Sequence, residues 1–121
     1  MSVRTGIIVF GHGSSVASAN EAVQSVAAEA GALGGWPLYE TAFLECPPTL
    51  ADGVEALVKR GATEVLVLPY FLTLGIHLKR DLPALVEELS ALHGISIRVT
   101  PPLHGHPGLS QILVERANAA V

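Results

Sequence analysis

Four short apolar runs alternate with helical patterns along this chain of 121 residues, and this alternation limits the fold more than any other feature. The runs cover residues 5–10, 37–44, 64–72 and 95–100. Strands that alternate with single helices form a parallel sheet through right-handed crossovers. The third run is almost continuously apolar, which is typical of a strand with helices over both faces. We therefore predict one α/β domain over residues 1–121, with a four-stranded parallel sheet.

The segments between these runs carry end signals of helices. Ser18 and Glu21 have the spacing of a capping box, and the glycines within residues 31–35 are expected to stop that first helix. Asp81 is expected to cap the third helix. The other predicted boundaries are a second helix over 50–60 before Gly61, an end of the third helix at Gly94, and a terminal helix after the loop 101–107.

The expected strand order is 2-1-3-4, the doubly wound arrangement of flavodoxin-like folds. In this order the chain leaves the first strand toward one edge of the sheet and the third strand toward the other. A crevice opens between these two strands, beyond their carboxyl ends, and ligands bind in such crevices. Residues that follow the first and third strands are therefore candidates for a functional site.

A histidine follows each of these two strands. His12 lies between Gly11 and Gly13 directly after the first strand, and His77 follows the third strand by a short loop. A tight turn explains the two glycines, but it does not require an imidazole between them. Neutral imidazole binds divalent first-row metal ions and also accepts protons. We predict that His12 and His77 belong to one metal-handling site.

Charged residues stand beside both candidate histidines. Glu45 ends the second strand, where it can accept a proton or make a weak metal contact; a solvated strand-end carboxylate is the alternative. Lys79 and Arg80 lie close to His77 and can bind anionic groups of a ligand. A solvated helix start explains these two cations equally well.

The remaining metal-binding residue types have simpler explanations. Cys46 precedes two prolines and fits a buried small residue better than a soft ligand. His104 and His106 form a loop pair that supplies only part of a ligand shell. His93 precedes Gly94 at a helix end, where a charged imidazole interacts favourably with the helix dipole.

Other catalytic motifs are absent from the glycine-rich turn. The segment has neither the G-x-G-x-x-G pattern nor a lysine-bearing phosphate loop, and it lacks the G-x-S-x-G order of a nucleophile elbow. A phosphohistidine at His12 remains an alternative, although the arginines that would clamp a phosphate beside it are missing.

The charge and the single cysteine exclude several classes of partner and compartment. A formal net charge of −4 opposes nucleic-acid binding, which needs clustered basic residues. The longest uncharged apolar stretch, residues 65–78, contains Pro69 and Gly75 and is shorter than the ~20 residues that cross a bilayer. The N-terminal segment lacks the features of a secretory signal, and one cysteine excludes a disulfide framework. We expect a cytoplasmic protein that binds neither nucleic acid nor membranes.

Four segments carry a resemblance to a known family. VFGHGSS…AN, FLECPPTL, VLVLPYFLTLGIHLKRDLP and LHGHPGL follow one another over nearly the whole chain. Together they resemble the successive motifs of the small sirohydrochlorin cobaltochelatase family (CbiX-like, class II chelatases), with the third segment the most specific. The resemblance implies a chelatase fold and the insertion of Co(II), or in relatives Ni(II) or Fe(II), into sirohydrochlorin, on routes to cobalamin, siroheme or a nickel tetrapyrrole.

The family's site residues map onto the candidates already named. Its two active-site histidines fall on His12 and His77, and its strand-end glutamate falls on Glu45. The resemblance also implies that small members pair as homodimers. Two positions depart from the family pattern: Ser15 replaces a common arginine, and His104 is an additional histidine in the closing motif.

These residues suggest a mechanism of metal insertion. We expect His12 and His77 to hold the incoming ion and accept protons, with assistance from Glu45. No permanent cofactor is expected, because the metal is a substrate. A metal or tetrapyrrole carrier that uses the same crevice without turnover is the alternative, and phosphoryl transfer through His12 is a third.

The tetrapyrrole is expected to bind between two subunits. Half of the residues are hydrophobic, which suggests apolar surface for a partner to cover, and one small domain offers only half a cleft for so wide a ring. The residues expected to contact the ring are Gly11, Gly13 and Ser14 at the first helix and the cations Lys79 and Arg80.

Overall fold

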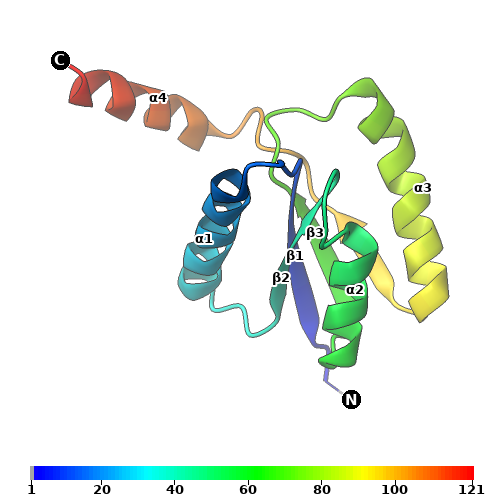
Figure 1. The fold of residues 1–121 in the computed structure, drawn as a ribbon. Coiled ribbons are helices and arrows are strands. Elements are labelled where there is room, and N and C mark those ends of the chain that lie inside the picture. The colour runs from blue at the N-terminus through cyan, green and yellow to red at the C-terminus, as the bar shows by residue number, and fades with distance from the viewer. Residues whose placement is uncertain (1) are drawn as a thin grey trace.

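The computed structural model describes residues 2–121, which form a four-stranded sheet and four helices (Figure 1). The strands are β1 (Thr5–Gly11), β2 (Tyr39–Phe43), β3 (Glu64–Pro69) and β4 (Ser96–Val99). The helices are α1 (Ala17–Gly34), α2 (Leu50–Lys59), α3 (Ile76–His93) and α4 (Pro107–Ala119). All strand pairs are parallel and the order is β2-β1-β3-β4, so the predicted topology is confirmed.

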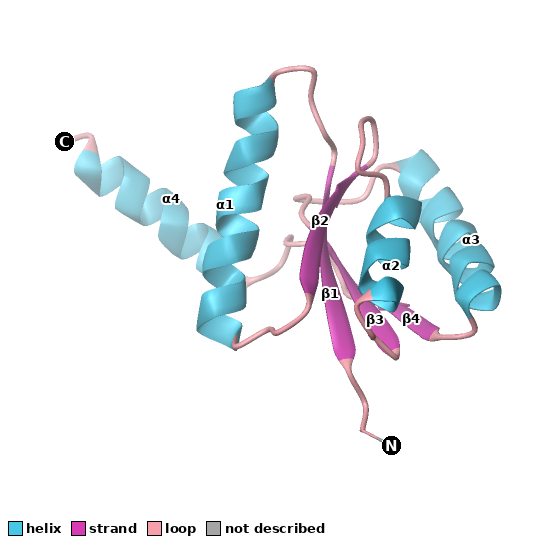
Figure 2. Cartoon of the chain, turned by 60° about the horizontal axis from the view of Figure 1, so that its bottom comes forward, coloured by secondary structure: helices cyan, strands magenta, loops and turns pink. Residues whose placement is uncertain are grey.

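The sheet separates α1 on one face from α2 and α3 on the other (Figures 1 and 2). The main core lies between the sheet and the helices α2 and α3. Successive side chains of a strand point to opposite faces, and every second residue of the central strands enters this core. Its fully buried members include Ile8 and Phe10 of β1, Val65 and Val67 of β3, and Leu57 of α2. The helices therefore cover both faces, as the apolar third run predicted.

The capping box predicted at Ser18 and Glu21 is wrong. Helix α1 begins earlier, at Ala17, and its N-cap Val16 makes no side-chain cap. The capping box lies instead at α2, where the Thr49 hydroxyl accepts from the amide of Asp52 and the Asp52 carboxylate accepts from the amide of Thr49. The helix also continues through Gly31 and ends at Gly34, with Gly35 in the left-handed conformation.

The predicted cap of the third helix is also wrong. Helix α3 begins at Ile76 after Gly75, so Asp81 lies inside the helix and not at its start. His77 is therefore in the first helical turn and not in a loop. This earlier start fixes the direction of His77 by the helical backbone, which holds a side chain more rigidly than a free loop does.

A further finding concerns membranes. No helix within residues 2–121 is long and apolar enough to cross a bilayer.

Candidate functional site

Both candidate histidines line one pocket at the carboxyl ends of the central strands. The pocket has a volume of about 250 Å³, and its walls include His12 after β1, His77 in α3 and the ring of Phe71 after β3. The His12 and Phe71 rings meet edge to face, with centroids 6.4 Å apart. The expectation that the topology brings the two histidines to the same crevice is therefore confirmed, whereas their chemical roles stay predictions.

The His12 ring has a defined tautomer. Its Nδ1 lies 3.1 Å from the carbonyl oxygen of Gly13. Because a carbonyl oxygen only accepts, Nδ1 must carry the proton, and the neutral ring then has its lone pair on Nε2. A backbone carbonyl commonly orients a metal-binding histidine in this way.

Glu45 faces that lone pair. The His12 Nε2 and a Glu45 carboxylate oxygen are 3.4 Å apart, and the two side chains are 60% and 63% exposed. With neutral His12 these two atoms are both acceptors, so only a proton or a metal ion between them makes the contact favourable. Two ligand atoms about 2.0–2.2 Å from one ion at a tetrahedral angle are separated by about 3.4 Å, as these two atoms are.

Backbone hydrogen bonds keep the two side chains together beyond the ends of their strands. The amide of Glu45 donates to the carbonyl of His12 at 2.9 Å, and the amide of Leu44 donates to the carbonyl of Gly11 at 3.0 Å. The parallel pairing of β1 and β2 thus continues into the loops. This pairing explains why two residues far apart in the sequence face each other.

Gly13 allows the turn that presents His12. Its φ is +87°, and a Cβ there would lie 2.9 Å from the Cys46 sulfur and 3.0 Å from the Cβ of Phe43. Both the backbone conformation and the space therefore require glycine. Gly11 is simply the buried last residue of β1.

Asn20, to which the sequence analysis gave no role, organises the rest of this loop. Its side-chain oxygen accepts from the amide of Ser14, and its amide group donates to the carbonyl of Ser14, both at 2.9 Å. The same amide group lies 3.5 Å from the sulfur of Cys46, which is partly buried. The Ser14 hydroxyl accepts from the amide of Val16. The polar groups of the loop are therefore largely hydrogen-bonded within the loop, and contact of Gly11, Gly13 and Ser14 with the ring stays a prediction.

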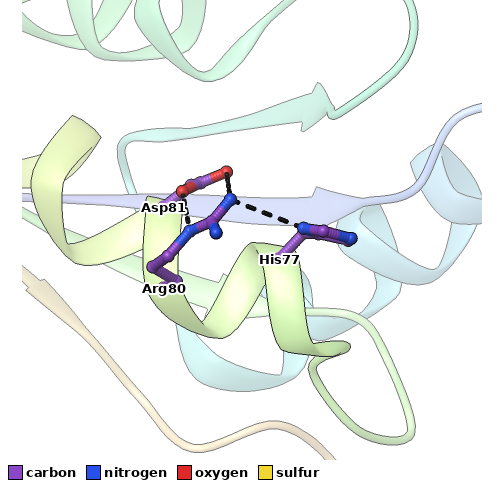
Figure 3. A network of polar contacts seen from close by, with 3 residues as sticks. All are labelled: His77, Arg80 and Asp81. Atoms are coloured by element: carbon purple, nitrogen blue, oxygen red, sulfur yellow. Dashed lines mark hydrogen bonds and ion pairs between the residues drawn. The ribbon is translucent and has the colours of Figure 1, made fainter.

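His77 takes part in a second polar network, shown in Figure 3. Arg80 Nη2 lies 3.4 Å from His77 Nδ1, and Arg80 Nε donates to the Asp81 carboxylate at 2.8 Å. The hydrogen bond with Arg80 lowers the pKa of the Asp81 carboxyl, and Asp81 raises the pKa of the Arg80 guanidinium. Because a guanidinium only donates, His77 Nδ1 accepts and the neutral ring carries its proton on Nε2. The two histidines thus face the pocket in opposite tautomers.

Lys79 does not share this pocket. It lines two neighbouring hollows, of which the smaller also contains His104. His106 is the N-cap of α4, where its Nδ1 accepts from the amide of Gly108 at 2.9 Å. His93 ends α3, as the sequence indicated.

The ligand set of the pocket is incomplete. Within residues 2–121 no group of three or more His, Cys, Asp or Glu side chains is arranged to hold a metal ion. His77 therefore shares a pocket with His12 but does not complete a ligand set with His12 and Glu45, and Glu45 is not part of the pocket wall.

Comparisons with known proteins give matches over most of this chain. The CbiX family profile matches residues 6–120. A sirohydrochlorin cobaltochelatase of Priestia megaterium is 34% identical over 93% of this chain and 37% of that protein. The crystal structure of a CbiX protein of cobalamin biosynthesis from Marinobacter aquaeolei superposes with a TM-score of 0.83 at 30% identity, over 96% of both chains. The sirohydrochlorin chelatase SirB of Bacillus subtilis subspecies spizizenii, solved in complex with cobalt, gives a TM-score of 0.76 at 32% identity, over 84% of this chain and 44% of that one.

The matched proteins differ in length. The chain spans between 37% and 57% of the length of four curated relatives. In those proteins the matched region is one part of a larger chain.

Proposed function

This chain belongs to the CbiX family, and we propose that it inserts a divalent metal ion, Co(II), Ni(II) or Fe(II), into sirohydrochlorin. The observation that carries the proposal is the His12–Glu45 pair, in which two electron-pair donors face each other at 3.4 Å, with His12 also in the wall of the pocket that contains His77. The names of the relatives support sirohydrochlorin as the substrate, and the cobalt in the SirB crystal supports Co(II) as one of the metals.

The first step is capture of the ion. The His12 Nε2 lone pair and a Glu45 oxygen replace two of the water molecules around the metal, while its other positions remain open. Imidazole and carboxylate together bind Co(II), Ni(II) and Fe(II), so this pair sets no strict preference among them. Its exposure keeps the ion accessible to the ring that approaches from the solvent side.

The second step is exchange of the metal for two protons. The ring nitrogens displace His12 and Glu45 from the ion, and two pyrrole N–H protons leave as two metal–nitrogen bonds replace them. The freed Glu45 carboxylate and His12 imidazole are the nearest acceptors for these protons. Charge therefore balances, because one divalent ion enters the ring and two protons leave it.

His77 must change its tautomer before it can bind the metal through Nε2. As a metal ligand through Nε2, His77 needs its proton on Nδ1, and Arg80 must then move away from that atom. A carboxylate of the ring competes for the Arg80 guanidinium and would release it. Binding of the ring thus prepares His77 as a ligand or proton acceptor.

The site is open enough to need a second copy. We place the ring between two subunits related by a two-fold axis, because each domain supplies only one side of a cleft. The exposed apolar residues Leu72 and Ile76 beside the pocket, 66% and 82% exposed, suit such an interface. The single cysteine is consistent with a reducing compartment, and we assign the reaction to the cytoplasm.

Carriage without turnover is the second candidate. Ser15 is exposed in the loop beside His12 and provides no cation for a ring carboxylate. A carrier would bind the ring or the metal without accelerating their reaction.

An anaerobic insertion assay separates the two functions. The chain is mixed with sirohydrochlorin and Co(II), and the visible absorption change is followed against the protein-free reaction. Insertion should proceed at least about 100-fold faster with the protein. Ring binding at the protein-free rate would leave only the carrier function.

The affinity for Co(II) is expected to fall as the pH falls from 7 to 5. An imidazole must be unprotonated to bind metal, and histidine side chains ordinarily have a pKa of about 6.5. Titration of the visible Co(II) spectrum at several pH values measures this dependence. An affinity that stays constant over the range would argue against imidazole ligands.

A further inference from the structure

We propose that Asn20 is the positioning residue that holds His12 and Glu45 at the separation at which both can bind one metal ion. This role depends on the proposed function, in which these two side chains take up the metal, and it names what sets their separation. Asn20 acts through the two loops that carry the pair, because its side chain is hydrogen-bonded to both of them.

The two metal-binding side chains are on separate loops beyond the sheet. His12 directly follows the last residue of β1, and Glu45 lies two residues after the end of β2. The backbone hydrogen bonds from Leu44 and Glu45 continue the strand pairing only as far as His12. Within residues 2–121, no backbone hydrogen bond joins residues 13–16 to residues 45–48. The outer parts of the two loops therefore depend on side chains for their relative position.

The side-chain amide of Asn20 bridges the two loops from the start of α1. Its oxygen accepts from the Ser14 amide and its nitrogen donates to the Ser14 carbonyl, both at 2.9 Å. The same nitrogen donates to the Cys46 sulfur at 3.5 Å. Ser14 is two positions after His12, and Cys46 directly follows Glu45. One half-buried side chain therefore ties the loop of His12 to the loop of Glu45.

The three contacts use the full chemistry of a carboxamide. An asparagine side chain has one acceptor oxygen and two N–H donors. The oxygen takes the N–H of Ser14, one donor faces the Ser14 carbonyl, and the other donor faces the Cys46 sulfur. Rotation of the amide by half a turn would set N–H against N–H, so these partners fix its orientation. A leucine, which has nearly the same shape, would make none of the three contacts.

The place of Asn20 in the helix indicates that its side chain serves the loops. Asparagine is a weak helix former, because its side chain competes for backbone groups. The hydrogen bonds of Asn20 go to Ser14 and Cys46, which both lie outside α1, and not to the amides at the start of the helix. The N-cap of α1, Val16, makes no side-chain cap. The helix therefore gains no cap from Asn20.

The two loops touch where Asn20 joins them. A Cβ at Gly13 would lie 2.9 Å from the Cys46 sulfur, so the backbone of one loop packs on a side chain of the other. Gly13 is next to His12 and Cys46 is next to Glu45, so a movement of either neighbour changes the 3.4 Å separation of the two donor atoms. A shift of about 1 Å would leave only one donor on the ion.

A double-mutant cycle on Co(II) affinity tests this role. The visible spectrum of Co(II) is titrated with the wild type, Asn20→Leu, Glu45→Ala and the double variant. Asn20→Leu should weaken Co(II) binding at least about tenfold in the wild type. It should weaken binding less than about twofold when residue 45 is already alanine, because no pair then remains to be positioned. Equal factors in the two backgrounds would overturn the proposal.

Gln24→Leu is the matched control, because it makes the same type of change one helical turn further along α1, where the side chain is exposed. It should leave the Co(II) affinity unchanged. Urea unfolding of each variant gives its folded fraction, to which the affinity is referred. Asn20→Ser, whose hydroxyl is too short to span both loops, should give the same pattern as Asn20→Leu. Folded variants of Asn20 that bind Co(II) as the wild type does would also overturn the proposal.

The cycle and the insertion assay fail independently. The cycle measures binding of the metal alone and needs no ring. A wild type that shows the expected coupling but does not insert the metal would contradict only the proposed function. A protein that inserts cobalt without coupling between Asn20 and Glu45 would overturn only the role of Asn20.

Discussion

Replacing His12 with alanine is expected to lower the rate of Co(II) insertion at least about 100-fold. The substitution removes the Nε2 lone pair that the Gly13 carbonyl directs toward the pocket. It leaves Glu45 as a single exposed carboxylate, which binds a divalent ion weakly in water. Both the capture of the ion and one proton acceptor are then lost.

Protein stability separates this loss from unfolding. The His12 side chain is 60% exposed, so its removal should change the free energy of unfolding by less than about 0.5 kcal/mol. His93→Ala, which removes a histidine at the far end of α3, is the control and should retain the wild-type rate. A His12→Ala protein that keeps more than about a third of the rate would place the metal elsewhere.

Gly13→Ala should affect both stability and insertion. A residue with a side chain is strained at a φ of +87°, and the new Cβ would press on Cys46 and Phe43. Together these effects should destabilise the fold by about 2 kcal/mol. The turn can relieve the strain only by moving away from β2, which separates His12 from Glu45 and should lower the insertion rate at least about tenfold.

Gly94→Ala provides the matched control for this substitution. Gly94 also has a positive φ, +65°, but a Cβ there meets nothing within 4 Å. It should therefore cost backbone strain alone, about 1 kcal/mol, with normal insertion. Urea unfolding and the insertion assay on both variants give the comparison. Equal losses of insertion in the two variants would mean that the close contacts at Gly13 do not position the site.

The sheet order and the meeting of His12 with His77 could be predicted because they depend on few features. The apolar runs define the strands, and the handedness of the crossovers leaves few ways to arrange four parallel strands. Residues that follow strands one and three then reach the same crevice whatever the details of the loops.

The helix ends could not be predicted with the same success. Three serines, Ser14, Ser15 and Ser18, lie near the start of α1, and only a residue with an extended backbone can act as a cap. Thr49 has that conformation, whereas Ser18 is already helical. The predicted start of α3 was too late, so the contact between Arg80 and His77 was not predicted. Both residues are in the helix, and residues three positions apart in a helix are neighbours on its surface.

Side-chain networks were the least predictable part. Lys79 and Arg80 are adjacent in sequence, but consecutive helical residues point in different directions, and only Arg80 lies against His77. Asn20 crosses six positions to hold Ser14, a contact that depends on the shape of the whole turn. The tautomers of the two histidines follow from such partners, which only the folded chain brings together.

The most direct test is to locate cobalt in the protein. A crystal of the wild type is soaked with Co(II), and anomalous scattering is measured at the cobalt edge. We expect a peak about 2.0–2.2 Å from both His12 Nε2 and a Glu45 carboxylate oxygen. A peak at another histidine, such as His104, with none at this pair, would contradict the account of how this chain takes up its metal.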